Sequence, residues 1–137
     1  MSDRTAKRVL VIDNEEYIRE VAQICLETVA GWEVLTAASG QEGLDVAEVE
    51  QPDAILLDVM MPGMDGLTTF QHLQANPTTK GIPVIFLTAR VQPSDIHHYR
   101  AIGITAAISK PFDAMELAIK VAEPLGWELE LQDVSVS

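Results

Sequence analysis

The chain has 137 residues, and 47% of them are apolar, which is enough for one domain with a hydrophobic core that needs no disulfides. Acidic residues outnumber basic ones by 21 to 9, giving a formal net charge of −12. This charge argues against nucleic-acid and anionic membrane partners, because both repel an acidic surface, and it favours a basic protein surface or a divalent cation.

Five short apolar runs alternate with helical patterns along the chain. They cover residues 9–12, 34–37, 54–57, 84–87 and 105–108. The first, third and fourth runs are continuously apolar, as is typical of central parallel strands that are covered on both faces. The second and fifth are more mixed, which predicts peripheral strands.

The first predicted helix follows Asp13, and Asn14 is the expected N-cap. Its apolar stripe includes Cys25, which we interpret as a small buried hydrophobe. Because Cys25 is the only cysteine, an internal disulfide is excluded.

The later helices have start signals of their own. These are two capping-box spacings, an acidic cap and a proline, at Ser39–Glu42, Asp113–Glu116, Asp65 and Pro93. The third helix should stop near Asn76, because a proline follows it, and Gly103 can close the fourth.

Strict alternation of five strands and helices predicts an α/β fold, a doubly wound parallel sheet with helices on both faces. In such sheets ligands bind at the carboxyl ends of the strands. The polar residues that follow the apolar runs are Asp13, Asn14, Asp58, Thr88 and Lys110. Crowded carboxylate and amide oxygens suit a hard cation such as Mg²⁺, and a carboxylate can also accept a phosphoryl group as a nucleophile.

At these strand ends the sequence resembles the receiver domain of two-component response regulators, over roughly residues 7–125. Four separated segments carry the resemblance, and they are Asp13, residues 57–66 (LDVMMPGMDG), Thr88-Ala89 and Lys110-Pro111-Phe112. The resemblance implies a flavodoxin-like strand order 2-1-3-4-5. It also implies a domain over residues 1–125 with a short tail at 126–137.

The resemblance implies a role for each site residue. Asp58 would be the phosphoacceptor. Mg²⁺ would be held by Asp13, Asn14, Asp58 and the backbone carbonyl of Met60. Thr88 would follow the phosphoryl group on activation. Lys110 would contact its oxygens, and the Lys110-Pro111 bond would be cis.

Asn14 departs from the family, which usually has an acid at this position. We expect weaker Mg²⁺ binding and slower phosphorylation, with Glu15 or Glu16 as candidates to compensate. A structural role of Asn14 as a helix cap is equally well supported.

Ala107 is the second departure, because the family often has an aromatic residue there that moves with the threonine. Either other side chains such as Tyr99 or Ile108 serve the switch, or partner binding depends less on phosphorylation. Met60 and Arg90 flank the site, and their bulk predicts a long-lived phosphorylated form.

The tail alternates apolar and polar residues from Trp127 through Leu129 to Leu131, which is a strand-like pattern. It could fold back on the domain, pair with another chain or remain frayed. No apolar run reaches membrane-spanning length and residues 1–8 lack a signal core, so we expect a cytoplasmic protein.

Three functions compete. The first is a stand-alone receiver, not an enzyme in its own right. It would be phosphorylated by a sensor histidine kinase or histidine phosphotransfer protein, and it would signal to a downstream protein or along a phosphorelay, as a monomer or weak homodimer. The second is a degenerate receiver that binds partners without phosphorylation. The third, a dehalogenase-type phosphatase, needs a second Asp where this chain has Met60.

Overall fold

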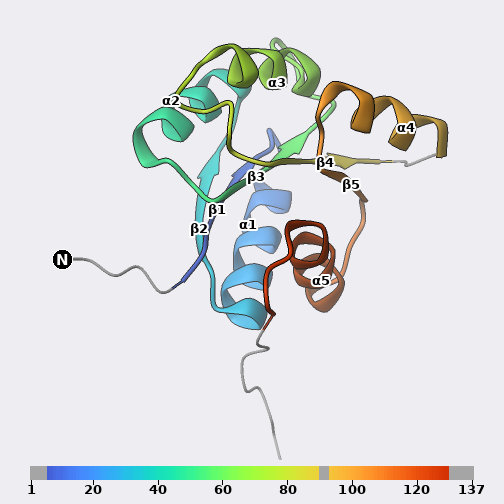
Figure 1. The fold of residues 1–137 in the computed structure, drawn as a ribbon. Coiled ribbons are helices and arrows are strands. Elements are labelled where there is room, and N and C mark those ends of the chain that lie inside the picture. Colours follow the sequence, from blue (N-terminus) through green and yellow to red (C-terminus); the bar gives the residue numbers. More distant parts are fainter. Residues whose placement is uncertain (1–5, 90–92, 130–137) are drawn as a thin grey trace, which may run out of the picture.

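The computed structural model describes residues 6–89 and 93–129, which form one parallel sheet between two layers of helices (Figure 1). The strands are β1 (Arg8–Ile12), β2 (Glu33–Ala37), β3 (Ala54–Asp58), β4 (Val84–Thr88) and β5 (Ala106–Ser109). The helices are α1 (Glu16–Cys25), a π-helical turn η1 (Leu26–Ala30), α2 (Gly40–Glu50), α3 (Gly66–Ala75), α4 (Pro93–Ile102) and α5 (Ala114–Leu125). The strand order β2-β1-β3-β4-β5 confirms the predicted fold class and topology.

The sheet divides the apolar core into two layers. Helices α1 and α5 cover one face, and α2, α3 and α4 cover the other (Figure 1). Successive side chains of a strand point to opposite faces, so Val9 and Val11 pack in the first layer while Leu10 and Ile12 pack in the second. All five residues of β3 and of β4 are buried, which confirms that their continuous apolar runs are central strands.

Three of the predicted helix caps are confirmed. The Ser39 hydroxyl accepts the Glu42 N–H at 3.1 Å. The carboxylate of Asp65 accepts the Thr68 N–H at 2.8 Å. The carboxylate of Asp113 accepts the Glu116 N–H at 2.7 Å. These bonds satisfy backbone donors that have no partner inside the helix, and they fix where α2, α3 and α5 begin.

The predicted cap at Asn14 is wrong. Helix α1 begins at Glu16, the cap position is Glu15, and no side chain caps it. The Glu15 N–H instead donates to Asp13 Oδ1 at 2.9 Å, while Asn14 is exposed. The Asp13 carboxylate at the end of β1 thus orders the turn that leads into α1, and Asn14 does not cap the helix.

The described part of the tail packs on the domain. Trp127 meets Trp32 edge to face, with ring centroids 5.1 Å apart, and Lys7 Nζ lies 5.1 Å from the Trp127 ring. Trp127 and Leu129 both contact the core layer formed by α1 and α5. Residues 127–129 form no strand, so the strand-like pattern is not realised there, and Leu131 lies outside the described residues.

Within residues 6–89 and 93–129, no helix has the length and apolar character required to cross a membrane.

Candidate functional site

Four predicted site residues come together at the carboxyl edge of the sheet. Asp13 follows β1, Asp58 ends β3, Thr88 ends β4 and Lys110 follows β5. The parallel pairing of β1 with β3, β3 with β4 and β4 with β5 places these strand ends at one edge. Residues up to 97 positions apart thus meet, as Lys110 and Asp13 do.

Backbone hydrogen bonds just beyond the strands hold the main chain at Asp13, Asp58 and Lys110 in place. The Asp13 N–H donates to Ala37 O at 3.1 Å, and the Lys110 N–H donates to Thr88 O at 2.8 Å. The N–H of Val59, directly after Asp58, donates to Leu87 O at 3.0 Å. The sheet ladder therefore continues into the site, and the functional side chains start from a rigid base.

The ammonium of Lys110 is the centre of the site. Lys110 Nζ lies 3.0 Å from Asp13 Oδ2 and 3.3 Å from Asp58 Oδ1. It also lies 3.5 Å from Glu15 Oε1. One ammonium thus bridges three carboxylates, and two of the three belong to the predicted site.

Burial makes the electrostatics of this cluster strong. Asp13 is completely buried, and Asp58 is 3% exposed. Burial raises the pKa of Asp58, and the nearby charge of Asp13 raises it further, while Lys110 opposes both. Burial of Lys110 disfavours its own charge, but its contacts with Asp13 and Asp58 outweigh that effect and raise the pKa of Lys110. The lysine therefore stays charged, and it offsets only part of the rise in the pKa of Asp58.

The loop after β3 is packed tightly against Asp58. The Met60 N–H donates to Asp58 Oδ1 at 3.4 Å, while the Met60 side chain is 75% exposed. The Gly66 N–H donates to Val59 O at 2.9 Å, and an added Cβ on Gly66 would lie 2.7 Å from Val59 Cα. The loop can close on Asp58 only because residue 66 has no side chain.

Two further residues contact the site that the sequence analysis did not assign to it. Arg19 Nη1 donates to Asp13 O at 2.8 Å and ties the start of α1 to the end of β1. Gly66 lies against the Asp58 backbone. Arg19 follows Asp13 by six residues, which gave no sequence signal, whereas Gly66 belongs to the motif at residues 57–66 and its role could have been inferred from it.

The remaining predicted residues are placed as follows. Thr88 is buried at the end of β4, and the Lys110-Pro111 bond is cis, as expected. Asn14 is exposed beside the cluster, so its role as a ligand stays a prediction. Arg90 lies outside the described residues.

The donor chemistry of the site fits a hard cation. Asp13 and Asp58 offer buried carboxylate oxygens, which are the ligands that a hard cation prefers. Over the described ranges, no three or more His, Cys, Asp or Glu side chains are grouped so that they could hold a metal. The predicted set does not require such a group, because its other donors are the Asn14 amide and the Met60 carbonyl.

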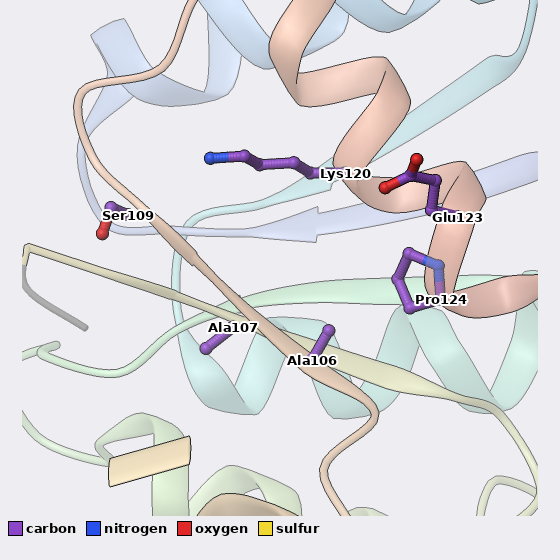
Figure 2. Close-up of a pocket in the computed structure, with 6 residues that line it drawn as sticks. All are labelled: Ala106, Ala107, Ser109, Lys120, Glu123 and Pro124. Carbon is purple, nitrogen blue, oxygen red and sulfur yellow. The ribbon is translucent and has the colours of Figure 1, made fainter. Parts of the chain in front are cut away.

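Ala107 lies on β5 beside two surface hollows rather than in the ion cluster. A pocket of about 510 Å³ runs between β5 and α5, and Figure 2 shows its lining, which is Ala106, Ala107, Ser109, Lys120, Glu123 and Pro124. A second pocket of about 120 Å³ lies between α4 and β5, where Ala107 and Tyr99 share the lining. Tyr99 packs edge to face on Phe86 with centroids 4.9 Å apart, whereas Ile108 is buried in the opposite layer. Of the two proposed substitutes for an aromatic at 107, Tyr99 is therefore the one on the same face.

Most of the chain matches one family of known proteins. The model of the response regulator receiver domain family matches residues 9–122. The transcriptional regulator RpaA of Synechocystis is 39% identical over 114 residues, which are 83% of this chain and 47% of that protein. The response regulator PleD of Caulobacter vibrioides is 36% identical over 127 residues, or 93% of this chain and 28% of that protein. The chain thus spans half or less of the length of these curated relatives.

Solved structures show the same architecture. The chemotaxis response regulator CheY4 of Vibrio cholerae superposes with a TM-score of 0.81 at 32% identity, covering 88% of this chain and 99% of that one. A putative response regulator from Chloroflexus aurantiacus gives a TM-score of 0.79 at 33% identity, with 89% and 99% coverage.

Proposed function

This chain belongs to the response regulator receiver domain family, and from that premise we propose that it accepts a phosphoryl group on Asp58. The observation that carries the proposal is the buried Asp58 carboxylate, held 3.3 Å from Lys110 Nζ at the carboxyl edge of the sheet. The donor is the phosphohistidine of a sensor histidine kinase or of a histidine phosphotransfer protein.

The transfer is a displacement at phosphorus. Asp58 forms a bond from a carboxylate oxygen to phosphorus as the bond from phosphorus to the donor's imidazole nitrogen breaks. That nitrogen keeps the electron pair, and the ring leaves as neutral imidazole because its other nitrogen carries a proton. Among the described residues, Lys110 Nζ and the Met60 N–H both contact Oδ1 of Asp58. Oδ2 is therefore the oxygen that attacks phosphorus. Positioning and electrostatic stabilisation carry most of the catalysis in such transfers.

Each neighbour of Asp58 has a role in this proposal. Lys110 neutralises charge on the transferred oxygens, and the Thr88 hydroxyl donates a hydrogen bond to them. Mg²⁺, when bound by Asp13, Asn14, Asp58 and the Met60 carbonyl, would neutralise further charge on the phosphoryl group. Met60 follows Asp58 by two residues and its side chain is exposed, so in this proposal it would hinder water and prolong the phosphorylated state.

The output in this proposal is a contact with another protein or onward phosphotransfer. The net charge of −12 supports a protein partner over nucleic acid. RpaA is named a DNA-binding regulator, but this chain matches only 47% of its length. The proposal further takes residues 1–125 as the receiver and 126–137 as its tail, in a cytoplasmic protein that is a monomer or weak homodimer.

A second function, partner binding without phosphorylation, is favoured by two observations. The neutral, exposed Asn14 replaces the usual acid, and the small Ala107 leaves no aromatic switch on β5. In that case the fold would present its surfaces in one fixed state.

Intact-mass measurement after incubation with Mg²⁺ and acetyl phosphate tests the proposal. We expect the native protein to gain one phosphoryl mass, and we expect Asp58→Asn to gain none. If neither acetyl phosphate nor a panel of histidine kinases adds that mass to the native protein, phosphorylation-independent binding is the better account.

A further inference from the structure

Three carboxylates face Lys110, and the third belongs to Glu15. Glu15 Oε1 lies 3.5 Å from Lys110 Nζ, slightly farther than the oxygens of Asp13 and Asp58. The backbone of Glu15 is fixed at the site, since its N–H donates to Asp13 Oδ1 and its carbonyl accepts the Arg19 N–H at 3.1 Å. The side chain of Glu15 thus starts from a rigid position beside the ion cluster.

The charge of the cluster depends on this residue. Asp13, Asp58 and Glu15 share the single ammonium of Lys110, which leaves two formal negative charges within this ion cluster, a match for one divalent cation. Arg19 lies nearby but donates to the backbone carbonyl of Asp13 rather than to a carboxylate. Without Glu15 only one negative charge would remain, because the neighbouring Asn14 is neutral. Affinity for a hard cation falls as the number of charged ligands falls.

We propose that Glu15 supplies the negative charge that Asn14 lacks, as a positioning residue of the Mg²⁺ site. The inference rests on the proposed function. Glu15 acts on the ion across water rather than as a direct ligand, because its side chain is 60% exposed and no three acidic side chains in the described segments are grouped tightly enough to bind a metal together. Mg²⁺ suits such an arrangement because it retains several of its waters.

Glu16 provides a matched control. It is the first residue of α1, it is exposed, and within the described residues no hydrogen bond or ion pair joins it to the cluster. Glu15→Gln and Glu16→Gln therefore remove the same formal charge one residue apart, and only the first removes it from the site.

Mg²⁺ affinity measured by calorimetry, with Mn²⁺ titration followed by electron paramagnetic resonance as a second readout, tests the proposal. A full charge acting on a divalent ion across one layer of water changes its affinity by about five- to tenfold. We expect the dissociation constant to rise by that factor in Glu15→Gln and by less than about twofold in Glu16→Gln. Circular dichroism without metal checks that both variants are folded.

A rescue experiment separates this role from a merely structural one. If Glu15→Gln lost affinity because the site had collapsed rather than because a charge was missing, a charge restored at residue 14 would not recover Mg²⁺ affinity. We expect the double variant Asn14→Asp/Glu15→Gln to bind Mg²⁺ at least as tightly as the native protein. Native affinity in Glu15→Gln, an equal loss in Glu16→Gln, failure of the rescue, or no saturable Mg²⁺ binding by the native protein would each overturn the proposal.

The two proposals can fail separately. Phosphorylation of Asp58 together with unchanged Mg²⁺ affinity in Glu15→Gln would overturn the role of Glu15 alone. Mg²⁺ binding that depends on Glu15, with no phosphoryl transfer, would overturn the proposed function alone.

Discussion

A methyl group at position 66 would clash with the backbone of the preceding loop. The nearest atoms to an added Cβ belong to the backbone of Asp58 and Val59, which cannot rotate away as a flexible side chain would. We expect Gly66→Ala to lower the free energy of unfolding by about 1–3 kcal/mol and to slow phosphorylation, because the loop must shift away from Asp58. Urea denaturation and intact mass measure these two effects.

Gly81→Ala is the control, because an added Cβ at Gly81 meets no atom within 4 Å. Its stability should stay within about 0.5 kcal/mol of the native value. Equal stability of the two variants would show that the loop accommodates a side chain at residue 66.

The sequence identified the charged partners at the residue scale but not their contacts. Asp13, Asp58 and Lys110 could be predicted to meet, because their strands end at one edge of a parallel sheet. The sequence left Glu15 and Glu16 as equal candidates. It also favoured Asn14 as the cap, because Asn is a good capping residue. Which glutamate lies beside Lys110 depends on the direction of the chain after β1. Asp13 accepts a hydrogen bond from the Glu15 N–H, and the Glu15 side chain then lies near Lys110.

At the scale of elements, the cap of α3 has a pH-dependent contribution. Hydrogen bonds from Thr68, chiefly from its backbone N–H, lower the pKa of Asp65 below its ordinary value of 3.8. A lowered pKa in the folded state means that the contribution is complete above the unfolded pKa and is lost as the pH falls through the folded one. We expect Asp65→Ala to reduce the free energy of unfolding by about 1 kcal/mol at neutral pH, and we expect this difference to shrink as the pH falls below about 4.

Chemical denaturation at neutral and acidic pH measures this difference. Asp65→Asn should retain most of the stability, since Asn also accepts the hydrogen bond of a cap. A loss in Asp65→Ala that stays constant down to the lowest pH would contradict the assignment.

The helices and strands could be predicted where an apolar run was continuous or where a capping residue marked the start of a helix. Continuous apolar runs located β3 and β4, and Asp113 marked the start of α5. The π-helical turn η1, which extends the first helix to Ala30, left no mark in the sequence, because a change in backbone hydrogen bonding requires no change in the apolar stripe.

At the scale of the whole molecule, the contact between Trp127 and Trp32 joins the last described segment to the start of β2. We expect Trp127→Ala to lower the free energy of unfolding by about 2 kcal/mol, from lost burial and lost edge-to-face contact. Trp127→Phe should recover part of that loss. Far-UV circular dichroism in urea is the suitable measurement, and an unchanged midpoint in Trp127→Ala would show that the tail does not stabilise the domain.

The position of the two tryptophans determines which structural changes their fluorescence can detect. Both lie together at the amino end of the sheet, and the length of a five-residue strand puts them roughly 15 Å from the ion cluster at the other end. Their emission should therefore stay nearly constant when a cation or a phosphoryl group arrives, and it should change when the last helix separates from the sheet. We therefore expect tryptophan emission to report whether the fold is intact and not whether the ion cluster is occupied.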